Sequence, residues 1–131
     1  NIHQFLALHK QTTLAAEPHS VSEAPDPAAA IVDLARSGDL VARQALSMFI
    51  SIYGAAVGDL ALVSLAYGGV YIAGGIATKL RVEMREGGFV EAYGRKGRMS
   101  PLVKQMPVSI ILSQDIGLLG ASLVASRLQD S

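Results

Sequence analysis

The sequence contains no cysteine among its 131 residues. Disulfide bonds, thiolate zinc sites and cysteine nucleophiles are therefore excluded. The absence of cysteine fits a reducing compartment and no signal peptide follows Asn1, so we expect a cytoplasmic protein. Because the chain begins without an initiator methionine, we also expect it to be cut from a longer protein.

Net charge is absent as well, because 11 Lys and Arg residues balance 11 Asp and Glu residues. This balance gives no support for binding to a polyanion, and no nucleic-acid partner is expected. Apolar residues make up 50% of the chain and charged residues only 17%, which excludes general disorder. The length predicts one domain or one lobe with a single core.

Familiar catalytic motifs are also missing. The sequence has no Walker loop, no HExxH motif, no pair of catalytic carboxylates and no nucleophile constellation. His3 and His9 lie six residues apart, which places them on different faces of a helix predicted over Asn1–Ala16. We therefore assign no catalytic and no metal-ligating residue in this chain.

The stretch that organises the chain covers residues 68–80. Its segment 70–72 is β-branched or aromatic and lies between glycine pairs, which predicts a strand buried on both faces of a mostly parallel sheet. Gly74-Gly75 then turns the chain into a helix predicted over Ile76–Glu86. Such a turn lets an anionic or polar ligand approach bare backbone near a helix N-terminus.

A long helix is predicted ahead of this stretch, over Leu40–Tyr67, with Asp39 as its N-cap. One face collects residues at three- and four-residue spacing: Leu46, Ile50, Tyr53, Val57, Leu60 and Ser64. We expect the second half of this helix to be buried on most sides. Gly54 and Gly58 share a face and predict a groove for a close neighbour.

The apolar run over residues 45–77 raises the alternative of a membrane span, and Gly54 to Gly58 matches a small-xxx-small motif. Asp59 lies within this run, where a carboxylate would be costly in lipid. We therefore favour a buried core helix. For Asp59 we favour a satisfied polar contact over a role as a ligand or metal contact.

The remaining segments alternate helices with a second strand. They are predicted as a loop over Glu17–Pro27, helices over Ala28–Ser37 and Ser100–Met106, a buried strand over Val108–Leu112 and a final helix over Ile116–Leu128. This order predicts a parallel α/β architecture. Two strands make a poor sheet, so we expect another segment or chain to complete it. Among the basic residues up to Arg98, only Lys79 follows the glycine turn closely enough to reach a ligand.

Several segments closely resemble the bacterial glucokinase family. They are Ala45-Leu46-Ser47-Met48-Phe49, Gly54, Gly58-Asp59-Leu60-Ala61-Leu62, Gly68 to Ile76, Gly88-Phe89, Lys96-Gly97-Arg98, Pro107-Val108 and Gly117-Leu118-Leu119-Gly120. Residues 68–76 look like the adenosine motif of the sugar-kinase, actin and heat-shock ATPase fold. One departure is Thr78, where many family members carry proline.

The resemblance implies a helix-rich α/β fold that is part of a ribonuclease-H-like (actin-like ATPase) lobe with two buried strands. Residues 1–131 would be the C-terminal part of the larger lobe. Residues 1–38 would supply N-terminal helices and a proline-rich loop, and residues 39–131 the long helix and a β-α-β-α nucleotide-side unit. The implied reaction is the phosphorylation of glucose by ATP, with Mg²⁺, to glucose 6-phosphate and ADP. Gly74, Gly75 and Ile76 would border the adenosine of ATP.

The resemblance also implies what this chain lacks. In the family, the catalytic carboxylate, the phosphate-binding Asp-x-Gly-Gly-Thr segment and the sugar-binding Glu-Gly-Gly-His segment precede the region that matches here. None of them occurs between Asn1 and Ser131, so we expect the isolated chain to be inactive. The implied partners are glucose and ATP, with a homodimer as a candidate assembly and no membrane. The alternative is a non-enzymatic helical module that uses its Gly54/Gly58 face for self-association or partner binding.

Overall fold

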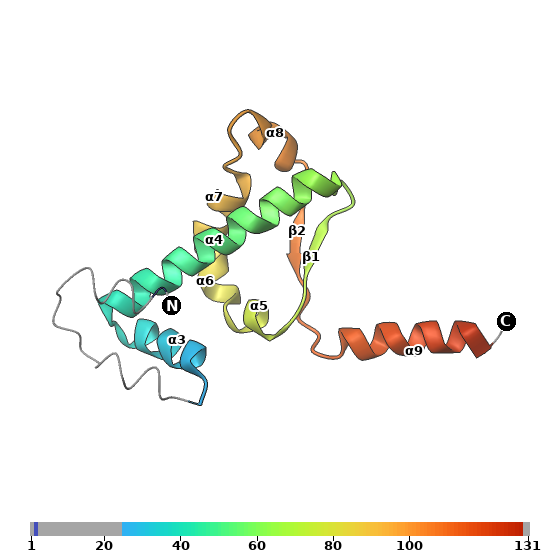
Figure 1. Ribbon diagram of the computed structural model, residues 1–131, viewed down its shortest axis with the longest axis horizontal. Coiled ribbons are helices and arrows are strands. Elements are labelled where there is room, and N and C mark those ends of the chain that lie inside the picture. Colours follow the sequence, from blue (N-terminus) through green and yellow to red (C-terminus); the bar gives the residue numbers. More distant parts are fainter. Residues whose placement is uncertain (1, 3–24, 130–131) are drawn as a thin grey trace.

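The computed structural model describes residue 2 and residues 25–129. This part of the chain is helix-rich, with two short parallel strands beside a long helix (Figure 1). The elements are α3 (Pro27–Ser37), α4 (Leu40–Ser64), β1 (Val70–Ile72), α5 (Gly75–Lys79), α6 (Arg81–Arg85), α7 (Gly88–Gly94), the 3-10 helix η1 (Gly97–Met99), α8 (Ser100–Val103), β2 (Val108–Ile110) and α9 (Ile116–Gln129). The predicted helix over Asn1–Ala16 and loop over Glu17–Pro27 lie almost wholly outside the described residues.

Local capping begins and ends α3 as the sequence predicts, and it begins α4. The Asp26 side chain accepts a backbone hydrogen bond of 3.1 Å in the first turn of α3, and Pro27 occupies the first helical position. Gly38 ends α3 in the left-handed region, at φ 104°. Asp39 then caps α4 by accepting a backbone hydrogen bond of 2.7 Å. The two helices follow one another directly and pack together.

The α4 helix is shorter than predicted. It ends at Ser64 rather than at Tyr67, because Leu65 adopts a left-handed conformation (φ 47°, ψ 52°) and its N–H bonds back to the last turn. By length and mean hydropathy (1.8) alone, α4 is long and apolar enough to cross a membrane. In this structure it instead packs against α3 and α7.

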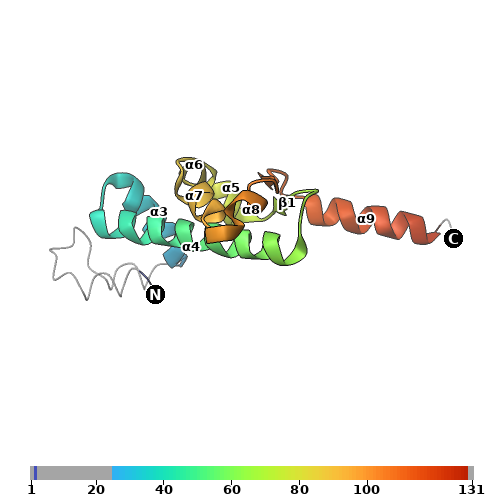
Figure 2. The same ribbon diagram turned by 90° about the horizontal axis from the view of Figure 1, so that it is seen from above.

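The described chain covers only one side of α4. Figure 2 shows α5, α6 and α7 together on that side. On other sides of the helix, Ile52, Leu60 and Val63 are exposed. The prediction that its second half is buried on most sides is therefore wrong, and Leu60 does not belong to the buried face. Periodicity identifies residues that share a face, but it does not say whether a neighbour covers them.

The closest helix contact joins α4 to α7 at Gly54 and Gly58. A Cβ atom on Gly54 would overlap the carbonyl oxygen of Phe89, and one on Gly58 would overlap that of Tyr93. The predicted groove for a close neighbour is thus confirmed, and the neighbour belongs to the same chain. The Gly54/Gly58 face is therefore already occupied by α7 and cannot serve the self-association that the alternative interpretation required.

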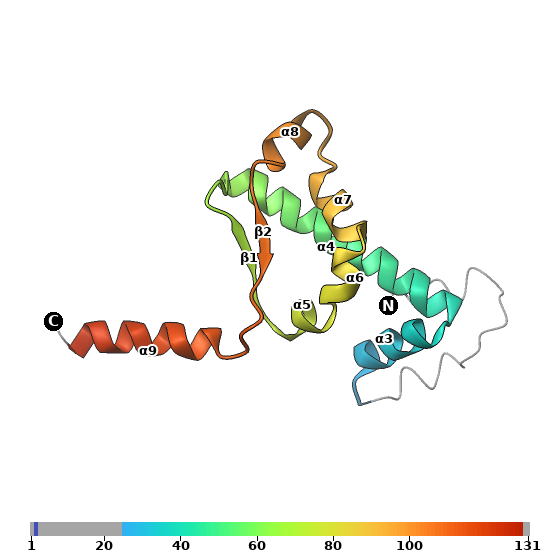
Figure 3. The same ribbon diagram turned by 180° about the vertical axis from the view of Figure 1, so that it is seen from behind.

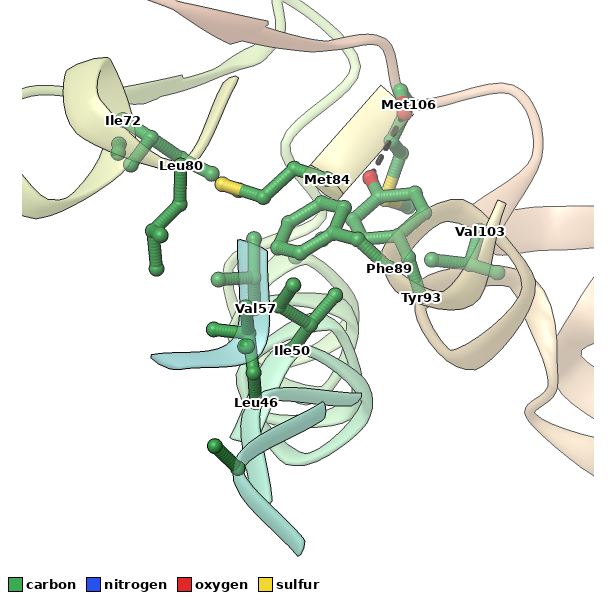
Figure 4. Packing of buried hydrophobic residues seen from close by; sticks show 14 residues of the cluster. Leu46, Ile50, Val57, Ile72, Leu80, Met84, Phe89, Tyr93, Val103 and Met106 are labelled. Atoms are coloured by element: carbon green, nitrogen blue, oxygen red, sulfur yellow. Dashed lines mark hydrogen bonds between the residues drawn. The ribbon is translucent and has the colours of Figure 1, made fainter. Parts of the chain in front are cut away.

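Aromatic side chains fill the space beside this contact (Figure 4). The rings of Tyr53 and Phe89 meet edge to face at 5.6 Å between centroids, and Tyr93 stacks on Phe89 at 6.5 Å. The buried Tyr93 hydroxyl donates a 2.7 Å hydrogen bond to the Met106 carbonyl. Burial raises the pKa of the Tyr93 phenol above its ordinary value near 10, because it disfavours the phenolate. This bond links α7 to Met106, which lies two residues before β2.

The two strands pair in parallel, as the sequence predicts, with Tyr71 opposite Ser109 (Figure 3). Ile72 points into the core, whereas the Tyr71 side chain is 65% exposed. The prediction of strands buried on both faces is therefore wrong for this chain. One sheet face packs on the core, and no described element covers the other face at Tyr71. A sheet face that no described element covers is consistent with a sheet that another segment or chain completes.

Three further segments differ from their predicted bounds or surroundings. The α8 helix covers only Ser100–Val103, and the Ser100 hydroxyl accepts a 2.8 Å bond from the Lys96 N–H instead of capping the helix. The second strand ends at Ile110 rather than at Leu112. The final helix is confirmed as α9, but it extends away from the other elements (Figure 1) and none of its described residues is buried.

The α4–α7 contact yields a first testable prediction. Substitution Gly54→Ala places a methyl group against the Phe89 carbonyl, so the two helices must separate. We expect the free energy of unfolding to fall by about 1–3 kcal/mol in urea titrations. The matched control is Gly88→Ala, whose Cβ meets Ser51 and Ile50 across the same interface at ordinary distances of 3.7 and 3.8 Å. Equal stability of the two variants would contradict the close approach.

Candidate functional site

The candidate site is the turn between β1 and α5. Gly74 adopts φ 105° and ψ 167°, a region that glycine occupies almost alone, and Gly75 begins the helix. The Gly74 carbonyl accepts bonds from the Thr78 hydroxyl at 3.1 Å and from the Thr78 N–H at 3.4 Å. Proline at position 78 could donate neither bond, so the threonine found here gives the turn an additional link.

The turn is open to ligands. A Cβ atom placed on Gly74 or on Gly75 would meet nothing within 4 Å. The next side chain, Ile76, is 60% exposed. The three predicted site residues therefore lie together and present bare backbone beside an exposed apolar side chain. This surface can accept a flat, partly apolar group against the backbone.

The helix after the turn is not the single element predicted over Ile76–Glu86. It divides into α5 and α6 at Leu80, which has φ −98° and ψ 13°. Leu80 is buried in the core together with Ala77 and Met84. At the break, the carbonyl of Lys79 accepts a 3.1 Å hydrogen bond from Arg36 of α3. This contact comes from 43 residues away in sequence, so helical periodicity gave no sign of it.

Arg36 also pairs with α6. Its Nε and Nη2 atoms lie 2.8 and 2.7 Å from Oε1 of Glu83. The second carboxylate oxygen of Glu83 is buried and has no hydrogen-bond partner among the described residues. Arg36 thus holds both sides of the α5–α6 break. Sequence reasoning placed Arg36 in the predicted helix over Ala28–Ser37 but gave it no role.

A cleft of about 690 Å³ lies next to this ion pair. Its described lining comes from the end of α3, from α4, from α6 and from the start of α7, and includes Arg36, Arg43, Glu83 and Glu86. The glycine turn is not among these residues. The cleft is therefore a neighbour of the candidate site and not part of it.

Lys96 and Asp59 form an ion pair with each other, whereas Lys79 lies on the surface near the turn. Lys96 extends into the interface beside Gly58, with its side chain only 9% exposed, and its Nζ lies 2.6 Å from the Asp59 carboxylate. Asp59 is thus in a satisfied polar contact, as the sequence favoured, although its side chain is exposed rather than buried. Lys79 lies at the far end of α5, one helical turn beyond the glycines, with an exposed side chain.

The described residues do not gather three or more His, Cys, Asp or Glu side chains into a group that could hold a metal ion. What the described turn can do chemically is bind and orient a ligand through its backbone.

Comparisons with family models, protein sequences and solved structures all identify the same family. A family model described as Glucokinase matches residues 1–128. The glucokinase of Nostoc sp. is 51% identical over 104 residues, which cover 79% of this chain and 30% of that protein. The glucokinase of Synechocystis sp. is 38% identical over 125 residues, which cover 95% of this chain and 35% of that protein.

A solved structure, the crystal structure of a glucokinase from an Antarctic psychrotroph, is similar over 99% of this chain and 37% of its own. The TM-score is 0.78 and the sequence identity 34%. Thus the chain spans about a third of the length of these relatives.

The conformation of the turn yields a second prediction. Gly74→Ala forces a side chain into a left-handed, extended region, and we expect a loss of about 1–3 kcal/mol in the free energy of unfolding. Gly75→Ala is the matched control, because this neighbouring position is equally open and has no positive φ; its effect should stay within about 0.5 kcal/mol. Urea unfolding of both variants makes the comparison. If Gly74→Ala proved as stable as Gly75→Ala, the positive φ at Gly74 would be wrong.

Proposed function

This chain belongs to the glucokinase family, and from that premise we propose that it supplies the adenosine-side turn of an ATP-dependent glucokinase. The proposed reaction transfers the terminal phosphoryl group of ATP to glucose, giving glucose 6-phosphate and ADP. The observation that carries the proposal is the open Gly74-Gly75 turn, placed between the parallel strand β1 and the helix α5.

The residues present fit the adenosine part of a nucleotide. Gly74 and Gly75 leave space above the backbone where any other residue would place a Cβ atom. Ile76 adds an exposed apolar surface next to that space, which suits the flat face of a base. In this assignment the three residues border the adenosine, and Thr78 stabilises the turn from behind through its bonds to the Gly74 carbonyl.

The resemblance to the family implies Mg²⁺, which would neutralise phosphate charge during transfer. The described residues offer no cluster of three or more metal-ligating side chains, and no magnesium ligand is assigned in this chain.

We further propose that the described elements are the C-terminal portion of the larger, ribonuclease-H-like lobe of such an enzyme. The parallel pair of β1 and β2 supports this. So does the exposed face at Tyr71, which the remaining part of a larger sheet would cover. A cytoplasmic location and a homodimer are expectations that accompany this assignment.

In the proposed enzyme, different parts of the full-length chain supply different catalytic functions. Phosphoryl transfer requires positioned substrates, charge neutralisation and a carboxylate that takes the hydroxyl proton. Of these, the present chain contributes positioning of the nucleotide. The base, the phosphate-binding segment and the sugar-binding segment belong to the parts of the family that precede the matched region.

A coupled assay tests this division. The full-length gene product that carries this chain should form glucose 6-phosphate when given glucose and ATP with Mg²⁺. The 131-residue chain alone should show no glucose-dependent ADP formation above background, because it lacks the base and the phosphate-binding segment. Activity of the isolated chain at enzyme-like rates, or an inactive full-length product, would overturn the proposal.

The role of the turn has its own test. Gly75→Val fills the space that the nucleotide would enter, and in the full-length gene product we expect the Kd for ADP to rise by about tenfold or more, equivalent to about 1.4 kcal/mol. Thermal unfolding without nucleotide should change little, because the new side chain meets no neighbour.

Gly120→Val provides the control. Gly120 is another exposed glycine with no atom near its Cβ position, and it lies on α9, outside the segment 68–76. The Gly120→Val variant should leave the Kd for ADP unchanged. Equal effects of the two valines on ADP binding, or a loss of stability equal to the loss of affinity at Gly75, would count against the assigned role.

A further inference from the structure

We propose that Arg36 is a positioning residue for the nucleotide, because it fixes α5 and, through α5, the Gly74-Gly75 turn. The inference rests on the proposed function, since it deepens the role given to the turn. Arg36 itself does not border the turn and is not assigned any contact with the ligand. It acts through the helix that connects the two.

The contacts of Arg36 converge on the far end of α5. Its Nη2 donates a 3.1 Å hydrogen bond to the carbonyl of Lys79, the last residue of α5. Its Nε and Nη2 also engage Glu83 on α6. A planar guanidinium holds two such acceptors in a fixed relative direction, which a lysine ammonium cannot do. Arg36 therefore fixes the orientation of α5 relative to α6.

The α5 helix needs an external support of this kind. It has five residues, and helices so short are not stable in isolation. Its last carbonyl groups have no partner within the helix, and the Arg36 bond supplies one for Lys79. Ala77 and Leu80 are buried in the core and hold one side of α5 against it. Because apolar contacts are non-directional, they do not fix the orientation of the helix.

A movement at one end of α5 reaches the turn directly. Five residues at 1.5 Å each give a helix about 7.5 Å long, with Lys79 at one end and Gly75 at the other. The bonds from Thr78 to the Gly74 carbonyl join the turn to the same helix. Rotation of α5 after loss of the Arg36 bond therefore displaces the backbone that would border the adenosine.

The helix that carries Arg36 packs against the core. Arg36 lies in the last turn of α3. The neighbouring Ala35 is buried against the core, and Gly38 ends α3 immediately before α4 begins. The guanidinium also borders the 690 Å³ cleft, so a shorter or uncharged side chain has room at this position. Replacement of Arg36 should therefore loosen α5 without creating a clash.

The test compares Arg36→Met with wild type in the full-length gene product. Removal of both polar links should raise the Kd for ADP and the KM for ATP by about three- to tenfold, which lies within the range for residues that act through a coupled element. The KM for glucose should stay within about twofold. Replacement of a residue that only supported the fold would raise the KM values for ATP and for glucose together. If Arg36→Met fails to fold, Arg36→Lys is tested in its place. It should raise the KM for ATP but not the KM for glucose, and by a smaller factor than Arg36→Met.

Arg95→Met is the matched control, because it removes an exposed 3.5 Å ion pair to Glu91 on α7, away from the turn. It should leave both KM values unchanged. An ADP affinity of Arg36→Met within twofold of wild type, or equal increases in the two KM values, would overturn the inference. A wild-type protein that binds no ADP and phosphorylates no glucose would instead overturn the proposed function, so the two failures are distinguishable.

Discussion

The close approach of α4 and α7 is the constraint on which the rest of this structure depends. Gly54 and Gly58 allow the backbones of the two helices to meet, and Phe89 and Tyr93 of α7 then fill the core beside them. Tyr93 extends this order toward the sheet through its bond to the Met106 carbonyl. The residue after Met106 leads into β2, whose parallel pairing fixes β1 and the turn that follows β1. A side chain on either glycine would therefore disturb more than a helix contact.

In the proposed function, this chain contributes a nucleotide-binding surface to a longer enzyme. Two ion pairs between described residues hold elements together: Lys96 with Asp59 between α4 and the segment after α7, and Arg36 with Glu83 between α3 and α6. The open turn is different, because its backbone faces free space. This division of tasks agrees with the family assignment, in which about two thirds of the relatives' length lies outside the matched region. A short helix held by one long-range arginine then connects the fold to the proposed ligand contact.

Much of the fold could be predicted because its causes are local. Asp26, Gly38 and Asp39 carry capping signals within one turn of the helix ends they define. The glycine turn and the strand before it also follow from adjacent residues. The residues predicted to form the site, Gly74, Gly75 and Ile76, are open to solvent. What could not be predicted depends on distant partners. The break at Leu80 coincides with the bond from Arg36, and the exposure of Tyr71 depends on which other segments complete the sheet.

In the proposed function, residues around Gly74 contact the adenosine of a nucleotide. Photolabelling of the full-length gene product with 8-azido-ADP, followed by peptide mapping, tests this contact. We expect the label on a peptide that contains residues 70–80, and we expect excess ADP to prevent it. Label confined to other peptides, or label in this peptide that excess ADP does not reduce, would contradict the claim.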